Sequence, residues 1–194
     1  MTPVLGTRGL RIGYGGNAIA TIPDVNFAPG RVWLVTGPNG CGKTTLLKTL
    51  AGLLPAVAGA VTPSMTRGRD GAVFVHSTPF LFKGSLRKNL RLAGDGVDAA
   101  SVASLFGLDA HLDQSVAHLS HGLRQRAAMA RAVLCGPKAL LLDEPEGGLD
   151  DQALARWRAF AQQTVERAQL TLIVAAHRPA GLEGLPLETI TLGP

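Results

Sequence analysis

Aromatic residues and cysteines are scarce in this chain of 194 residues. Phe, Trp and Tyr together make up 5% of it, so the core must consist mainly of Leu, Ala and Val. The two cysteines, Cys41 and Cys135, lie far apart and provide neither metal-ligand spacing nor a disulfide framework. These shortages exclude a disulfide-stapled secreted domain and favour a reducing, cytoplasmic compartment.

Neither a signal-peptide pattern nor an unbroken membrane-spanning run is expected from this sequence. Its first letters, MTPVLGTRG, contain no apolar core of a signal peptide. Residues 49–66 carry no charge over 18 positions, which is long enough for a span, but Pro55 and Pro63 would break that helix. We expect a buried helix end there, followed by a turn and a strand. The protein is then soluble, or peripheral to a membrane that another chain spans.

Charged residues make up only 17% of the chain, yet they leave a net charge of +5. A basic balance admits nucleic acid, an anionic membrane surface or a phosphorylated ligand as partner. The arginines of 124–131 sit at helical spacing with no aromatic residue between them, unlike a strip that stacks on bases. We therefore expect a solvated helix face there and no nucleic-acid partner.

Apolar runs alternate with helical patterns along the chain. Runs typical of buried strands lie at 31–36, 71–76, 139–145, 170–177 and 187–192. Helical patterns lie at 43–54, 124–134 and 152–168, short helices are expected in 85–119, and short strands around a Gly-rich turn in 9–27. This order predicts an α/β fold with a largely parallel sheet and helices on both faces.

The stretch GPNGCGKTT fits the pattern G-x-x-x-x-G-K-[ST] at every fixed position. Glycines let main-chain N–H groups turn around an anion, and the following helix adds the positive end of its dipole. Lys43 is expected to reach the β- and γ-phosphates of a nucleotide, and Thr44 to ligate Mg²⁺. The predicted nucleotide-binding residues of this loop are Gly37, Pro38, Asn39, Gly40, Cys41, Gly42, Lys43, Thr44 and Thr45.

A second motif, LLLDEP, ends a predicted buried strand with two acids. Parallel strands deliver their carboxyl ends to one edge of the sheet, so these acids should lie beside the phosphates. We expect Asp143 to hold Mg²⁺ and Glu144 to orient or deprotonate the attacking water.

The run LSHGLRQR (119–126), followed by AAMARAVL and then LLLDEP, resembles the signature region of ATP-binding cassette (ABC) proteins. The resemblance covers nearly the whole chain. It implies that Tyr14 stacks on adenine, that Ser120 and Gly122 touch the γ-phosphate bound by a partner copy, and that His177 contacts the γ-phosphate. It also implies that the loop 148–150 meets the other subunit.

The resemblance implies a P-loop NTPase (RecA-like) core whose parallel sheet is flanked by helices, with an N-terminal antiparallel β subdomain and a small α-helical subdomain. On this pattern residues 1–194 form one nucleotide-binding domain. Residues 1–78 and 136–194 would form the core, and 79–135 the helical subdomain that carries the signature.

The implied function is that of the ATP-binding and hydrolysing subunit of a membrane transporter, with ATP and Mg²⁺ as cofactors. Two cassettes would close around ATP and move a transmembrane permease subunit from the cytoplasmic face of the membrane. Residues 76–90 resemble the segment that docks the permease and slightly favour import of a small solute or oxyanion. A soluble, non-transport ABC ATPase and an exporter cassette are the alternatives.

The sequence departs from the family pattern in three motifs. His121 and Leu123 replace a glycine and a glutamine of LSGGQ, His76 or Ser77 stands where a glutamine is expected, and Gly147 replaces a small hydroxyl residue. The His121 side chain could crowd the partner's nucleotide, attract it when protonated, or point to solvent. His76 could still hydrogen-bond or ligate.

We expect slow hydrolysis in the isolated protein, and either a homodimer or a heterodimer whose partner supplies a complete signature. Residues 80–82 (FLF) either line a docking groove or pack internally.

Overall fold

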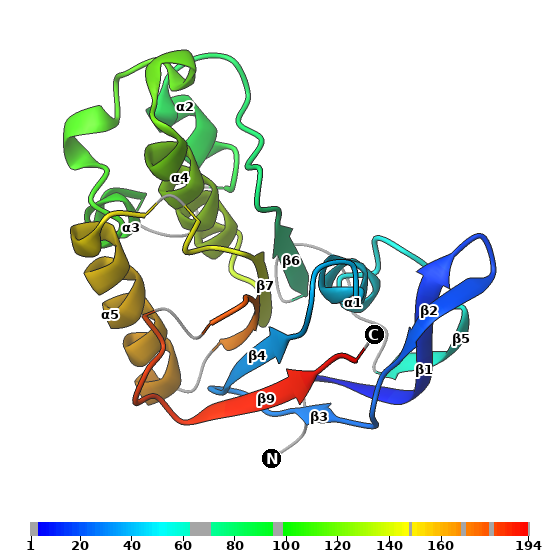
Figure 1. Cartoon of the computed structure of the whole chain (residues 1–194). Helices are drawn as coiled ribbons and strands as arrows, with labels where there is room; N and C mark the ends of the chain where they lie inside the picture. The colour runs from blue at the N-terminus through cyan, green and yellow to red at the C-terminus, as the bar shows by residue number, and fades with distance from the viewer. Residues whose placement is uncertain are drawn as a thin grey trace.

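The computed structural model describes residues 4–62, 71–94, 99–147, 149–167, 170–178 and 181–193 (Figure 1). Its strands form two sheets. The antiparallel sheet contains β1 (Leu5–Tyr14), β2 (Asn17–Thr21), β3 (Asn26–Phe27) and β5 (Ala58–Thr62). The other sheet contains β4 (Val32–Thr36), β6 (Ala72–Val75), β7 (Ala139–Asp143), β8 (Thr171–Ala175) and β9 (Leu187–Thr191).

The second sheet has the order β6-β7-β8-β4-β9, and every neighbouring pair in it is parallel. The predicted parallel sheet is therefore confirmed. All residues of β7 and β8 are buried, which explains why these strands are continuous apolar runs and do not alternate with polar residues. The carboxyl ends of all five strands meet at one edge, where the candidate site lies.

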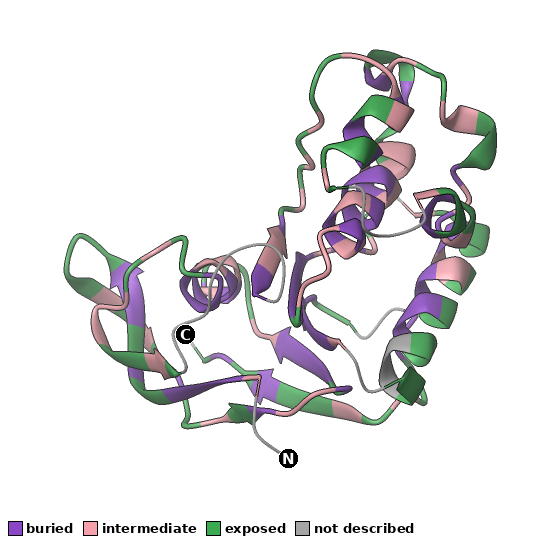
Figure 2. Ribbon diagram, turned by 180° about the vertical axis from the view of Figure 1, so that it is seen from behind, coloured by how far each residue is buried: buried purple, intermediate pink, exposed green. Residues whose placement is uncertain are grey.

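Helices cover both faces of this sheet (Figure 2). The α-helices are α1 (Lys43–Leu50), α2 (Leu86–Arg91), α3 (Ala99–Leu105), α4 (His121–Leu134) and α5 (Asp151–Arg167), with two short 3-10 turns, η1 (Asp109–His111) and η2 (Val116–His118). Alternate strand residues face opposite cores, because side chains of a strand alternate with a period of two.

The two cores share the sheet but contain different helices. Leu140 and Leu142 of β7 pack in one core with buried residues of α2, α3, α4 and α5. Leu141 of β7 packs in the other with α1 and with the antiparallel sheet. Helices α1 and α4 therefore lie on opposite faces of the sheet, as the labels of Figure 1 show.

Several element boundaries differ from the sequence expectations. Helix α4 begins three residues before the predicted 124 because Ser120 caps it, its hydroxyl accepting from the Leu123 amide at 3.2 Å. Strand β1 begins at Leu5, not 9, because it pairs with β2, β3 and β5. In the stretch 49–62 a helix end is followed by a turn and β5, as predicted, whereas 63–66 lie outside the described residues.

The predicted helical subdomain, 79–135, contains α2, α3 and α4 in the structure. Its boundaries as a subdomain stay a prediction. Within the described ranges, no helix has the length and apolar composition that crossing a bilayer requires.

Candidate functional site

The loop between β4 and α1 contains three glycines whose backbone conformations other residues rarely adopt. Gly37, Gly40 and Gly42 have φ values of 149°, 80° and 102°, in the region that disfavours other residues. A Cβ on Gly37 would lie 2.5 Å from the carbonyl oxygen of Leu192 and 2.7 Å from Sγ of Cys41. The loop thus approaches the end of the sheet too closely for a side chain, and α1 begins directly after Gly42.

Lys43 folds back over this loop. Its side chain is largely buried, and Nζ donates to the carbonyl oxygens of Gly37 at 2.9 Å and Pro38 at 3.1 Å. A half-enclosed ammonium group at the start of a helix is a strong partner for phosphate oxygens. The sequence-predicted loop residues Gly37–Thr45 lie together around it.

Thr44 and Asp143 come from different elements and meet at the sheet edge. The Thr44 hydroxyl lies 3.0 Å from both carboxylate oxygens of Asp143, which ends β7 and is 4% exposed. Burial raises the pKa of Asp143, while the Thr44 hydrogen bond and the electrostatic interaction with the His76 ring oppose that rise. A hydroxyl and a carboxylate in contact are the hard oxygen donors that fit Mg²⁺.

Glu144 is the one non-glycine with positive φ, 48°, among the described residues. Its amide donates to the Ala175 carbonyl at 2.8 Å, which fixes the turn after β7 to the end of β8. Its Oε1 lies 3.4 Å from Nε2 of His177, and both side chains are about half exposed. Such backbone strain is common at functional sites, and here it occurs in the residue that follows Asp143 at the end of β7.

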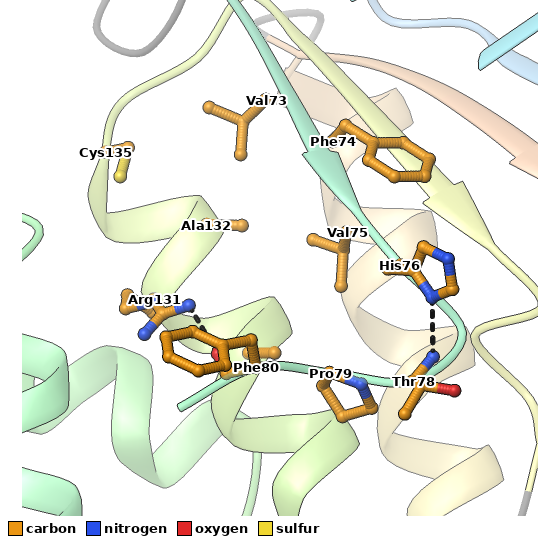
Figure 3. A pocket seen from close by; sticks show the side chains of 11 residues that line it. Val73, Phe74, Val75, His76, Thr78, Pro79, Phe80, Arg131, Ala132 and Cys135 are labelled. Carbon is orange, nitrogen blue, oxygen red and sulfur yellow. Dashed lines mark hydrogen bonds between the residues drawn. The ribbon is translucent and has the colours of Figure 1, made fainter. Parts of the chain in front are cut away.

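His76 is the residue that follows β6, and Figure 3 shows a nitrogen of its ring directed at the main chain of Thr78. Its Nδ1 accepts a hydrogen bond from the Thr78 amide at 2.9 Å. In the neutral ring the other nitrogen, Nε2, then carries the hydrogen and acts as a donor. Of the two roles left open by the sequence, this geometry favours hydrogen bonding over metal ligation.

Tyr14 ends β1 beside the loop, with its hydroxyl 3.1 Å from Oγ1 of Thr45 and its side chain 53% exposed. Ile19 of β2 is exposed nearby: a Cβ on Gly42 would lie 3.2 Å from its Cδ1. Ile19 gave no signal in the sequence, because its place beside the loop depends on the pairing of β2 with β1. Stacking of Tyr14 on adenine stays a prediction.

The signature residues are not brought to the loop of their own chain. Ser120 caps α4 and Gly122 lies in its first turn, whereas the loop precedes α1 on the other face of the sheet. His121 between them is exposed. Leu149 and Asp150 precede α5, and Asp150 accepts from the Ala153 amide; Gly148 lies outside the described residues.

Glu146 is a further acid near the site, and the motifs described above do not include it. Its pKa is raised to about 7, mainly by burial and in smaller part by the charges of Glu144 and Asp143, while a main-chain hydrogen bond opposes the rise. The signal in the sequence was a third acid in DEPEGG.

The exposure of Phe80 and Phe82 decides whether these rings pack internally or lie on the surface. Their side chains are 68% and 52% exposed, so the expectation of internal packing is wrong for both rings. Leu81 between them packs against the core that contains α4.

Comparison with known proteins agrees with this geometry. The family described as ABC transporter matches residues 22–147, more than half of the chain. The sn-glycerol-3-phosphate import ATP-binding protein UgpC of Chromohalobacter salexigens is 32% identical over 187 residues, 87% of this chain and 50% of that protein. The Fe(3+) ions import ATP-binding protein FbpC of Mesorhizobium japonicum is 34% identical over 198 residues, 89% of this chain and 53% of that protein.

A relative named for export also matches. The Nod factor export ATP-binding protein I of Cupriavidus metallidurans is 34% identical over 173 residues, 79% of this chain and 56% of that protein. The chain thus spans about half the length of these curated relatives.

A solved structure of the ATP-binding subunit of an ABC transporter superposes with a TM-score of 0.77 at 25% identity. The superposition covers 89% of this chain and 79% of the solved one. The predicted P-loop NTPase core, with its parallel sheet, flanking helices and additional antiparallel sheet, is confirmed. On these matches and this fold, the chain belongs to the ABC transporter family.

Proposed function

We propose that this chain is the ATP-binding and hydrolysing subunit of an ABC membrane importer. The observation that carries the proposal is the convergence at one sheet edge of a glycine loop closed by Lys43, the Thr44–Asp143 pair, and the Glu144–His177 pair. These groups provide a cation for phosphates, oxygen donors for a metal, and a carboxylate for water.

The loop residues would bind ATP through their main-chain amides, with Lys43 moving from the Gly37 and Pro38 carbonyls to phosphate oxygens. Tyr14, already at the loop through Thr45, would cover the base together with Ile19. Thr44 and Asp143 would hold Mg²⁺, which neutralises phosphate charge when bound.

Glu144 would orient the attacking water and accept its proton, and His177 would donate a hydrogen bond to the terminal phosphate. The 3.4 Å contact between Glu144 and His177 keeps the two groups close enough to act on one reacting centre. His76, with Nε2–H free of the Thr78 contact, is placed to donate a further hydrogen bond at this edge.

A second cassette would complete the site. Ser120 caps α4 and Gly122 lies in its first turn, and α4 packs on the opposite face of the sheet from α1, which follows the phosphate loop. This arrangement supports a role for both residues at a nucleotide held by another chain. We propose a homodimer, or a heterodimer with a cassette of complete signature, in which each copy contributes its α4 start to the nucleotide of the other.

The exposed Phe80 and Phe82 would dock a transmembrane permease subunit on the cytoplasmic side of the membrane. A cavity of about 600 Å³ beside them includes Phe80, Lys83 and Arg124 in its lining. Residues 79–92 contain four basic and no acidic side chains, and only Arg87 is paired within the described residues, with Asp113 at 2.8 Å. A permease segment with apolar and acidic side chains fits this surface.

Import is proposed because two of the relatives above are named for import, of sn-glycerol 3-phosphate and of Fe(3+) ions. The Nod factor export relative keeps an exporter cassette as the second candidate. Co-purification distinguishes them: an importer is expected to associate with a permease and a solute-binding protein, whereas an exporter associates with a permease alone.

Calorimetric titration with Mg-ATP tests the nucleotide site. We expect binding by the wild type and a loss of affinity of at least about tenfold in Lys43→Ala. Lys138→Ala removes an exposed lysine at the opposite end of β7 and is the matched control. Absence of binding by the wild type, or equal affinity in Lys43→Ala, would contradict the proposal.

A further inference from the structure

The segment between β6 and α2, residues 76–85, carries the exposed aromatic pair Phe80 and Phe82. The two rings meet edge to face, with centroids 5.1 Å apart. Exposed rings on an irregular segment keep one arrangement only if the main chain beneath them is held. Two side chains from two helices hold it here.

Asn89 of α2 is the first of these side chains. It is 1% exposed and binds both main-chain groups of Phe82: Oδ1 accepts from the Phe82 amide at 2.8 Å and Nδ2 donates to its carbonyl at 2.9 Å. Nδ2 also donates to the Ser85 carbonyl at 3.1 Å. The Asn89 side-chain amide thus satisfies the main-chain groups of Phe82, as a neighbouring strand would in a sheet.

Arg131 of α4 is the second. Its Nη2 donates to the Phe80 carbonyl at 2.7 Å, the bond drawn in Figure 3, and Nη1 donates to Oδ1 of Asn89 at 3.3 Å. Its guanidinium carbon lies 5.5 Å from the centroid of the Phe82 ring. One planar fork therefore contacts both aromatic residues and the side chain that holds them.

The Arg131 guanidinium is held by neutral groups. Burial lowers its pKa, and in the described part of the chain no carboxylate lies within ion-pair distance of it. Placing a cation among neutral acceptors is costly. This cost indicates that the contacts serve to position the segment, since a methionine of similar length would fill the same space without it.

Packing beneath the segment is incomplete, which increases the importance of these bonds. A cavity of about 200 Å³ lies between β6, the start of the segment and α4, lined by Val73, Val75, Ala132 and Cys135 among others (Figure 3). Across this cavity the segment is joined to α4 through Arg131, while Leu81 packs against the core that contains α4.

Arg131 also lies on the helix that begins with the signature. It follows Ser120 by eleven residues, about 16 Å along a helix axis. An α-helix moves as a rigid element, and buried residues of α4 fix it in the core with α2 and α3. A shift at the start of α4 would therefore move the Arg131 fork.

We propose that Arg131 is a positioning residue that couples the nucleotide state sensed at the start of α4 to the arrangement of the aromatic pair. The proposal rests on the proposed function, because it needs a nucleotide that engages Ser120 and a partner that engages Phe80 and Phe82. Movement of α4 pulls the Phe80 carbonyl directly and Phe82 through Asn89. Loss of the Arg131 guanidinium leaves nucleotide binding intact, but the aromatic pair no longer responds to the bound nucleotide.

The test uses the full chain with 4-fluorophenylalanine at position 82 as a fluorine NMR probe. Addition of Mg²⁺ and the slowly hydrolysed analogue AMP-PNP is expected to shift the resonance of the wild type. In Arg131→Met the shift is expected to fall to less than about a third while the affinity for AMP-PNP stays within about twofold. Arg131→Lys, which keeps the charge but not the fork, replaces it if that variant does not fold.

Arg126→Met is the matched control. Arg126 lies on the same helix and its Nη1 likewise donates to main-chain carbonyls, those of Phe106 at 2.9 Å and Gly107 at 3.2 Å, away from the aromatic pair. This variant is expected to keep the fluorine response.

The outcomes separate the proposal from the function on which it rests. A full response in the Arg131 variants, or no response in a wild type that binds AMP-PNP, overturns the coupling role and leaves the nucleotide-binding proposal intact. Failure of the wild type to bind the nucleotide overturns both. Hydrogen exchange gives a reading without nucleotide: the Phe82 amide is expected to exchange faster in Arg131→Met and unchanged in Arg126→Met.

Discussion

Glu146 carries the clearest pH dependence at the scale of single residues. Its pKa is raised from an ordinary 4.5 to about 7, mainly by burial. A raised carboxyl pKa means that the folded state disfavours the charged form, so the associated loss of stability is absent below about pH 4.5. The loss grows as the pH rises from there to about 7 and then stays constant.

We therefore expect Glu146→Gln to raise the melting temperature at pH 8 by on the order of 2–4 °C, allowing for solvent screening of a partly exposed group. The gain should shrink toward zero at pH 4.5. Differential scanning fluorimetry across this range measures it, with the exposed Glu183→Gln as control. An equal gain at both pH values would contradict the assignment.

The orientation of His76 leads to a prediction about metal affinity. Because its Nδ1 accepts from Thr78, the neutral ring offers a donor and not a lone pair to the metal site. Replacement by glutamine restores a side-chain oxygen, so His76→Gln is expected to bind Mn²⁺ several-fold more tightly in the presence of AMP-PNP. Titration followed by electron paramagnetic resonance measures this affinity, with His76→Ala as control.

In that experiment, weaker Mn²⁺ binding by His76→Ala than by the wild type would show that the imidazole ligates. Nitrogen NMR of the ring gives an independent reading, since the structure requires hydrogen on Nε2 in the neutral form.

At the scale of elements, the start of α4 separates what the sequence could predict from what it could not. The periodic run from 124 was sufficient to place the helix, and the buried strands were readable because both their faces are covered. The sequence did not indicate the first turn, because its position depends on the Ser120 cap and because His121 and Gly122 have weak helical preference. Asn89 and Arg131 gave no signal, because their partners are main-chain groups of a loop.

The same distinction holds for the candidate site. Glycine spacing and the DEP turn were enough to select the loop, Asp143 and Glu144, because local motif chemistry specifies them. The ring orientation of His76, the burial of Glu146 and the position of Ile19 depend on contacts between segments far apart in the chain. Such contacts could not be derived from one sequence.

Helix α4 also provides a test of its departure from the family pattern. His121 is exposed at the first helical position, next to Ser120 and Gly122, which the proposed dimer brings to the nucleotide of the partner copy. If the imidazole crowds that nucleotide, we expect His121→Ala to hydrolyse ATP several-fold faster, and alanine avoids the helix penalty of glycine, about 1 kcal/mol. Steady-state phosphate release measures the rate, with His118→Ala as an exposed control. No gain would rule out crowding.

At the scale of the whole molecule, the opposite placement of α1 and α4 predicts association that depends on nucleotide. Glu144→Gln should retain ATP without hydrolysing it, so this variant with Mg-ATP is expected to elute as a dimer on size-exclusion chromatography. Lys43→Ala should elute as a monomer under the same conditions. A monomeric Glu144→Gln with bound ATP would instead favour a heterodimer with another cassette.

That placement has a genetic consequence. A Lys43→Ala copy has a damaged loop and an intact α4 start, while a Ser120→Arg copy has the reverse. Each variant alone should be inactive, because both sites of its dimer are defective. A mixed pair should regain one working site, so two inactive alleles expressed together would complement each other. A chain that carries both substitutions should stay inactive when it is expressed alone.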